Sequence, residues 1–160
     1  MDDFGSSVLR QLIDEFSDSV QKTHADLGDA TALVDPKRIE AVMHFLRDEA
    51  DFDMLMDLTA VDYLGQTPRF EVVYHLYATG TNQRVRIKAR VAEEAAEIAS
   101  VVGLYVSANW MEREVFDLYG IRFDGHPDLR RILLYDEFEG YPLRKDYPKE
   151  RRQPLVGPRN

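Results

Sequence analysis

The first third of the chain carries two segments in which apolar residues recur at helical spacing. In residues 4–20 apolar side chains fall at every fourth position, with polar residues opposite, which predicts one helix. This stripe consists of Phe4, Val8, Leu12, Phe16 and Val20. A second helix is predicted after Asp35, because aspartate caps helix N-termini and Pro36 suits the first turn. Its apolar face consists of Ile39, Val42, Met43 and Leu46.

The middle of the chain shows the two-residue period of β-strands. Residues 57–63 and 70–78 are predicted strands, and a turn at 79–82 leads to a third strand at 84–91. In this third strand apolar residues alternate strictly with Arg84, Arg86, Lys88 and Arg90. That alternation indicates a half-buried antiparallel strand with a cationic outer face. Such a face is usually solvated, and the alternative is a docking face for an acidic partner.

Two further helices are predicted before residue 121. Alanine-rich residues 93–102 favour a helix that ends at Gly103. Asn109 and Glu112 have the spacing of a capping pair for another helix, which ends at Gly120. The predicted fold is therefore α+β, with helices packed on one face of a mostly antiparallel sheet.

The composition changes after residue 120, where five of the seven prolines lie. Proline at this density excludes long helices and central strands. We therefore expect residues 1–120 to form a globular body and residues 121–160, the C-terminal arm, to run extended across a surface, all within one domain. The arm is rich in aromatic side chains and cannot bury them alone, so it needs its own body or another chain.

The composition of the 160 residues also excludes several classes of function. Without cysteine the chain has no disulfide, no thiolate zinc site, no cysteine-ligated iron–sulfur cluster and no thiol nucleophile. Residues 1–60 contain 14 acidic and 5 basic side chains and carry the whole net charge of −9, which disfavours nucleic acid as a partner. No apolar run approaches the roughly 20 residues of a membrane span, so no direct span is expected.

Residues 109–148 combine dense charge with aromatic side chains, and three hypotheses account for them. The first is a metal site with the candidate ligands Glu112, Glu114, Asp117, Asp124, His126 and Asp128. Its spacing is poor, because Glu112 and Glu114 diverge on a helix and one histidine among arginines is a weak ligand set. The second is acid–base catalysis by His126 and a nearby carboxylate, which no nucleophile, phosphate-loop or dinucleotide motif accompanies.

The third hypothesis is a partner interface, which the pairing of opposite charges favours. Arginine binds carboxylates bidentately, and arginine with aromatic side chains dominates binding hot spots. Here the basic residues Arg113, Arg130, Arg131, Arg144 and Lys145 alternate with the acidic residues Glu112, Glu114, Asp117, Asp128 and Asp146. Arg113 and Asp117 are four residues apart, so they face each other on the predicted helix. The alternative is a structural network inside the monomer, since buried charges must satisfy one another.

Four short motifs in this region resemble a known family. They are ERE at 112–114, DLYGI at 117–121, FDGHPDLRRIL at 123–133 and GYPLRKDYP at 140–148. Together with LTAVD at 58–62 they are similar to the C subunit of NADH–quinone oxidoreductase, respiratory complex I. One departure is Tyr141, where the family more often has histidine or tryptophan.

The resemblance implies a non-catalytic structural and assembly subunit in the peripheral arm of this proton-pumping complex, on the cytoplasmic side of the bacterial inner membrane. It implies no cofactor in this chain, with FMN, iron–sulfur clusters and quinone handled by partner subunits, chiefly D, then B and I. Pairing and resemblance together assign these residues to the partner interface: Glu112, Arg113, Glu114, Asp117, His126, Asp128, Arg130, Arg131, Tyr141, Arg144, Lys145 and Asp146. Two alternatives are a homologous subunit of a membrane-bound hydrogenase or F420-type oxidoreductase, and a stand-alone acid–base enzyme using His126 and nearby carboxylates.

Overall fold

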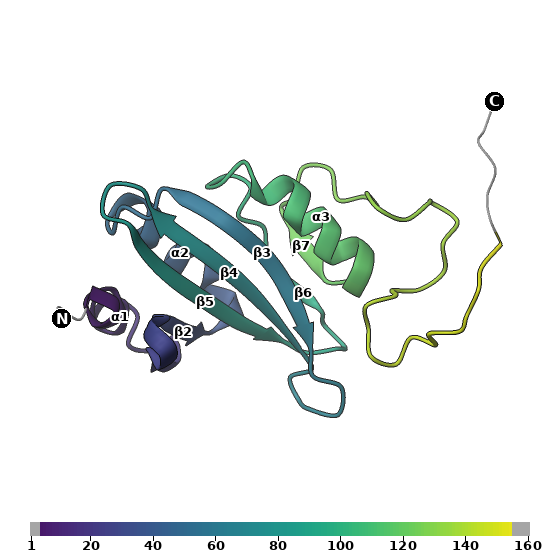
Figure 1. Cartoon of the computed structure of the whole chain (residues 1–160), viewed down its shortest axis with the longest axis horizontal. Helices are drawn as coiled ribbons and strands as arrows, with labels where there is room; N and C mark the ends of the chain where they lie inside the picture. Colours follow the sequence, from purple (N-terminus) through teal and green to yellow (C-terminus); the bar gives the residue numbers. More distant parts are fainter. Residues whose placement is uncertain (1–3, 155–160) are drawn as a thin grey trace.

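A mixed five-stranded sheet forms the centre of the computed structural model, which describes residues 4–154, with side chains from residue 7 onward (Figure 1). The spatial order of the strands is β1-β2-β5-β4-β3. Their bounds are β1 Val20–His24, β2 Thr31–Val34, β3 Met54–Asp62, β4 Phe70–Ala78 and β5 Gln83–Val91. Neighbouring strands are antiparallel except β2 and β5, which are parallel. The prediction of a mostly antiparallel sheet is confirmed.

Within the part of the chain that the structure describes, three α-helices accompany the sheet: α1 Phe4–Glu15, α2 Ile39–Asp48 and α3 Ala108–Tyr119. Helix α1 ends five residues before the predicted limit, because the chain turns at Phe16 and enters β1 at Val20. The side chain of Phe4 lies outside the described ones. The Asp35 carboxylate accepts the Lys37 amide at 2.9 Å, so it caps the 3₁₀ turn (η2, Pro36–Arg38) that leads into α2, at the predicted position.

One face of the sheet is buried under the helices, and the other is open. The register of β4 and β5 places Phe70, Val72, Tyr74 and Leu76 on the same side as the apolar residues of β5, and all four are buried. The core there includes apolar side chains from α1, α2 and α3, and α2 lies behind the sheet in Figure 1. The cationic residues of β5 alternate with these positions and therefore lie on the open face.

The helix predicted at residues 93–102 is wrong. The chain there forms turns and a short strand, β6 (Glu97–Ala99), which pairs in parallel with β7 (Arg122–Asp124). Ile98 is buried in the core, and the Val101 amide donates to the Glu112 carboxylate. Alanine's helix propensity is weak compared with this tertiary pairing, so the local pattern misleads.

The C-terminal arm begins with β7, and the rest of its described length, residues 125–154, contains no helix or strand. Because β7 pairs with β6, the predicted boundary at residue 120 falls between α3 and a strand attached to the body. Beyond β7 the arm passes beside α3, on the right in Figure 1. Residues 155–160 lie outside the described part, and an extended docking role for the arm stays a prediction.

Candidate partner interface around helix α3

Asp117 joins helix α3 to the C-terminal arm. Its side chain is fully buried, and one carboxylate oxygen accepts the amides of Ile132, Leu133 and Leu134 at 3.0, 2.8 and 2.9 Å. The other oxygen accepts Arg131 Nη1 at 2.7 Å. Burial by itself raises the pKa of Asp117, but these donors together hold it below its ordinary value. Asp117 is therefore a charged anchor for the chain turn at residues 131–134.

Two arginines continue this anchor. Arg113 donates from Nε and Nη2 to the carbonyls of Arg130 and Arg131, at 3.1 and 3.0 Å, and stacks over the Trp110 ring. Arg131 also donates to the Phe138 carbonyl at 3.0 Å. Asp117 thus pairs with Arg131 instead of its helix neighbour Arg113, because tertiary partners reach both side chains. The predicted facing pair on the helix is not formed.

A second anchor lies at the start of β4, around Arg69. This guanidinium is 4% exposed and binds Asp62 through two bonds of 2.8 Å. It also binds Asp146 of the arm at 2.8 and 3.0 Å, and Glu93 at 2.6 Å. Hydrogen bonds from Arg69 lower the pKa of both Asp62 and Asp146. One buried cation therefore links the body to the arm through three carboxylates.

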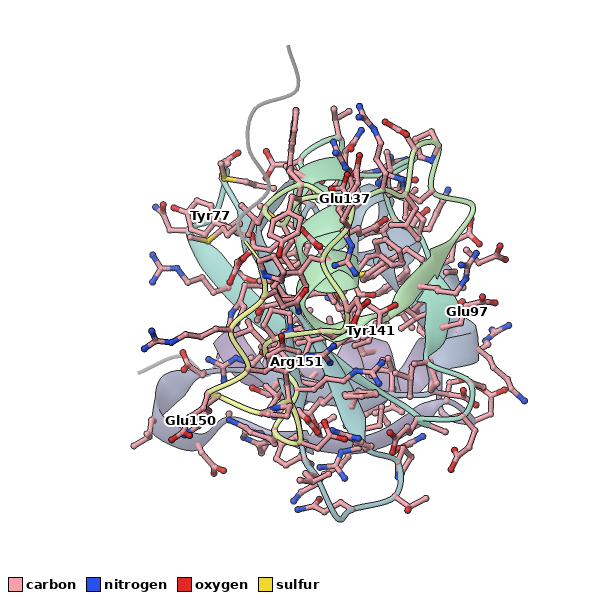
Figure 2. The ribbon with its side chains drawn as sticks, turned by 90° about the vertical axis from the view of Figure 1, so that its right-hand side faces the viewer. Tyr77, Glu97, Glu137, Tyr141, Glu150 and Arg151 are labelled. Carbon is pink, nitrogen blue, oxygen red and sulfur yellow. The ribbon has the colours of Figure 1, made fainter. Side chains whose placement is uncertain are left out.

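Residues next to Asp146 complete this second anchor. The Lys145 amide donates to Asp62 at 2.7 Å, and Arg144 Nε donates to the Tyr119 carbonyl at 2.6 Å. The Arg144 guanidinium lies over the rings of Phe70 and Tyr141, 5.0 and 4.7 Å from their centroids. Figure 2 looks onto this side of the molecule, with Tyr141 on the arm.

Gly120 lets the arm approach the end of α3. Its φ of 74° is the left-handed C-cap predicted for this helix, and a Cβ placed there would lie 2.5 Å from the Tyr141 ring. Glycine is thus required twice, for the backbone turn and for the contact with the arm. The aromatic ring at position 141, the departure from the family pattern, packs directly on this turn.

Glu112 lies inside the body, with no exposed surface. Its carboxylate accepts Ser100 Oγ at 2.6 Å and the Val101 amide at 2.7 Å. Burial raises the pKa of Glu112 to about 7, against the lowering effect of these two donors. The Tyr74 hydroxyl is also buried and has no hydrogen-bond partner among the described residues.

The other predicted interface residues are distributed along the surface. Glu114 is exposed on α3, and Asp128 pairs with Arg130 at 2.8 Å on the surface. His126 accepts the Asp128 amide through Nδ1, at 3.0 Å, and lies 3.2 Å from the Asn109 carbonyl through Nε2. Both ring nitrogens of His126 therefore contact main-chain groups, and the residue stabilises the turn of the chain after β7.

The structure thus separates the twelve predicted residues into two groups. Glu112, Arg113 and Asp117 are buried and bind within the chain, as expected for a structural network inside the monomer, which is the alternative to a partner interface. The remaining nine are half-buried or exposed, and their role toward a partner stays a prediction. Across residues 4–154 no group of three or more histidine, aspartate and glutamate side chains is placed to hold a metal ion.

Sequence reasoning missed Arg69, the centre of the second anchor. The available signal was its position one residue before a strong strand, whose first residue pairs across the hairpin with Asp62. Among the described residues, four exposed apolar side chains around α3 and the arm were also not assigned: Val106 is 82% exposed, Trp110 and Leu133 are each 62% exposed, and Leu143 is 47% exposed.

Comparison with known proteins decides the family. Residues 32–153 match the family described as respiratory-chain NADH dehydrogenase, 30 Kd subunit. This chain belongs to that family. The NADH-quinone oxidoreductase C subunit of Trichlorobacter lovleyi is 51% identical over 93% of this chain and 94% of that protein. The resemblance found in the sequence motifs is therefore confirmed.

Two solved structures resemble this member of the 30 kDa subunit family. A trypsin-resistant fragment (1–134) of Nqo5 is 32% identical, with a TM-score of 0.67, and covers 76% of this chain and 98% of the fragment. A chain of an archaeal membrane-bound sulfane sulfur reductase is 24% identical, with a TM-score of 0.75, over 91% of this chain and 86% of that one. The second likeness concerns the fold alone. Among the described residues no helix has the length and apolar character to cross a membrane.

Proposed function

We propose that this chain is a structural subunit of NADH–quinone oxidoreductase that holds the quinone-reducing subunits together without catalytic residues of its own. The large D subunit is the chief partner, followed by B and I, on the cytoplasmic side of the inner membrane. FMN, iron–sulfur clusters and quinone belong to those and other subunits. The names of the relatives support membership of the complex.

The observation that carries this proposal is the double anchoring of the C-terminal arm. Asp117 fixes the turn at residues 131–134, and Arg69 fixes Asp146, so the chain between them is held at both ends. A segment already held in place loses less conformational entropy when it binds a partner. Its outward side chains, with Leu133 and Leu143 exposed, thus form a preorganised surface.

A matched set of exposed leucines tests the proposal. Leu133→Asp and Leu143→Asp place a charge on the arm, whereas Leu64→Asp places one in the β3–β4 turn at a similar exposure of 51%. We expect each arm variant to reduce recovery of the D subunit with the tagged chain at least about tenfold, or about 1.4 kcal/mol of binding free energy. The Leu64 variant should bind normally.

Full recovery of the D subunit with both arm variants would contradict the proposed interface. Identification of the copurifying chains also separates the alternatives, since hydrogenase or F420-type partners would replace the NADH-oxidising subunits. Turnover by the isolated chain that His126→Ala abolishes would establish the stand-alone acid–base enzyme instead.

A further inference from the structure

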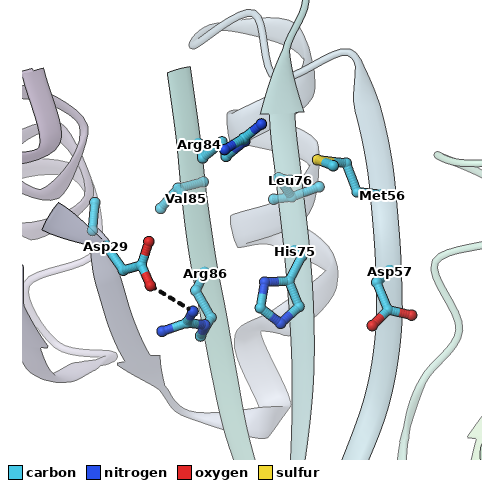
Figure 3. A pocket seen from close by; sticks show the side chains of 9 residues that line it. Asp29, Met56, Asp57, His75, Leu76, Arg84, Val85 and Arg86 are labelled. Atoms are coloured by element: carbon cyan, nitrogen blue, oxygen red, sulfur yellow. Dashed lines mark hydrogen bonds and ion pairs between the residues drawn. The ribbon is translucent and has the colours of Figure 1, made fainter. Parts of the chain in front are cut away.

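The face of the sheet opposite the helices contains a hollow that the interface around α3 does not use. Its volume is about 420 Å³, and β3, β4 and β5 line it together with Asp29. Register places Asp57, His75 and Arg86 in one row across these three strands, and Arg86 binds Asp29 at 3.0 Å (Figure 3). Met56, which is 46% exposed, lies at the same hollow.

A smaller hollow of about 200 Å³ lies farther along the same face. Lysine and arginine outnumber aspartate and glutamate in the lining of the two hollows by five to three. The basic residues are Lys22, Arg84, Arg86, Lys88 and Arg90, and the acidic residues are Asp29, Asp57 and Glu71. The open face is therefore positive on a chain whose net charge is −9.

The acidic side chains of the face pair with three of the four cations of β5 and leave Arg84 without an ionic partner among the described residues. Glu71 forms ion pairs with both Lys88 and Arg90, at 3.0 and 3.2 Å. Arg84 contacts no carboxylate of the described residues and rests over the Tyr77 ring, 5.6 Å from its centroid. Because Arg84 is exposed at the rim of the larger hollow, its guanidinium is available to a carboxylate from outside.

His75 adds a neutral polar group to the larger hollow. Partial burial and the Arg86 guanidinium lower the pKa of His75, against the opposite effect of Asp57 and Asp29. Within the described part of the chain the ring has no hydrogen-bond partner, and it lies between Arg86 and Asp57 in Figure 3. An uncharged imidazole there can donate one hydrogen bond to a bound chain and accept one from it.

We propose that this open face is a docking surface for an extended acidic segment of a neighbouring subunit, laid along β5. Alternate residues of a strand are about 6.6–6.8 Å apart, so the four cations of β5 form a ladder at that spacing. Carboxylates on alternate residues of an extended partner segment have the same spacing. The proposal rests on the proposed function, because the partner belongs to the assembled complex, and it concerns a face separate from the arm.

The absence of cysteine makes a direct test possible, because one introduced cysteine is a unique label in this chain. Met56→Cys probes the open face, and Ile13→Cys, on the helix side and 41% exposed, is the control. Maleimide labelling of this chain is compared between the isolated full-length protein and the purified complex. We expect Met56→Cys to react at least about tenfold more slowly in the complex, and Ile13→Cys to react at similar rates in both.

A charge reversal tests the recognition itself. Arg84→Glu in the Met56→Cys background should restore most of the labelling rate in the complex. Lys37→Glu reverses an exposed cation near α2 and should leave the protection intact. An unchanged melting temperature of the isolated variants shows that the fold is retained.

Three results would overturn the proposal. Equal labelling of Met56→Cys in the complex and in the isolated chain means that nothing covers the face. Protection in the isolated chain that grows with its concentration assigns the face to a second copy. If Met56→Cys stays protected from labelling in the complex that carries Arg84→Glu, charge does not determine the docking. Failure of the proposed function is distinguishable, since this chain would then be missing from the purified complex.

Discussion

Removing the charge of Asp117 should release the arm from helix α3. In Asp117→Asn one oxygen remains for the three amides of residues 132–134, but the new amide group faces Arg131 and no longer offers it a charge. Breaking a buried ion pair costs about 3–5 kcal/mol. Because the Arg131 side chain is 18% exposed and can be partly hydrated, we expect about 3 kcal/mol, at the low end of that range.

Hydrogen exchange measures this loss of stability directly at the three amides that Asp117 binds. A cost of about 3 kcal/mol, if it falls on local opening, accelerates exchange of the amides of Ile132, Leu133 and Leu134 by about a hundredfold. Trypsin cleavage after Arg131 should accelerate in parallel. Asp128→Asn is the control, because its pair with Arg130 is exposed and contributes little. Unchanged exchange and cleavage in Asp117→Asn would refute the anchoring argument.

The sign of the pH dependence follows from the same contacts. Since the folded-state pKa of Asp117 lies below its ordinary value, its contribution is present at neutral pH. The contribution is lost as the pH falls through the folded-state pKa. Protection of the three amides should therefore weaken in acid for the native chain, and much less for Asp117→Asn.

Three further predictions concern single residues of the body. Gly120→Ala combines a left-handed backbone with a clash, so it should lower the melting temperature, and a smaller side chain at Tyr141 should recover part of the loss. Glu112→Gln should remove an ionisation that destabilises the folded chain. Because the pKa of Glu112 is raised from 4.5 to about 7, the free energy of unfolding of the native chain falls by about 3 kcal/mol as the pH rises through that interval. Urea unfolding at about pH 5 and pH 8 should show this slope for the native chain and not for the variant. Arg69→Met leaves Asp62 buried without its partner and should cost about 3–5 kcal/mol in urea unfolding; a loss under about 1 kcal/mol would contradict the second anchor.

Periodicity predicted the elements whose own side chains determine them. β4 was predicted with its observed bounds and β5 to within one residue, because each has a strong apolar face. Helix α3 ends where predicted, but it begins at Ala108 with Ser107 at its N-cap, so Asn109 lies inside the helix and does not cap it. The short strands β1 and β2 and the β6–β7 pair gave no such pattern. They form because partners distant in the sequence complete their hydrogen bonds, and one of them replaced a predicted helix.

The candidate site shows the same division. Charge density and the motifs identified residues 109–148 as the candidate site. Spacing along the helix predicted a pair between Arg113 and Asp117. In the folded chain Asp117 instead binds Arg131 and three main-chain amides. Nothing local distinguishes the buried Glu112 from the exposed Glu114. Their environments differ because one side of α3 packs on the sheet and the other does not.

The sequence by itself determined the helices and strands with strong periodicity, the α+β class, the absence of thiol chemistry and the family. Only the tertiary structure decided which charges lie inside, since burial depends on elements that meet in space. It also revealed Arg69, which binds groups 7, 24 and 77 residues away in the chain. Local sequence patterns do not predict such contacts, because the contacts form only when the sheet, α3 and the arm have packed together.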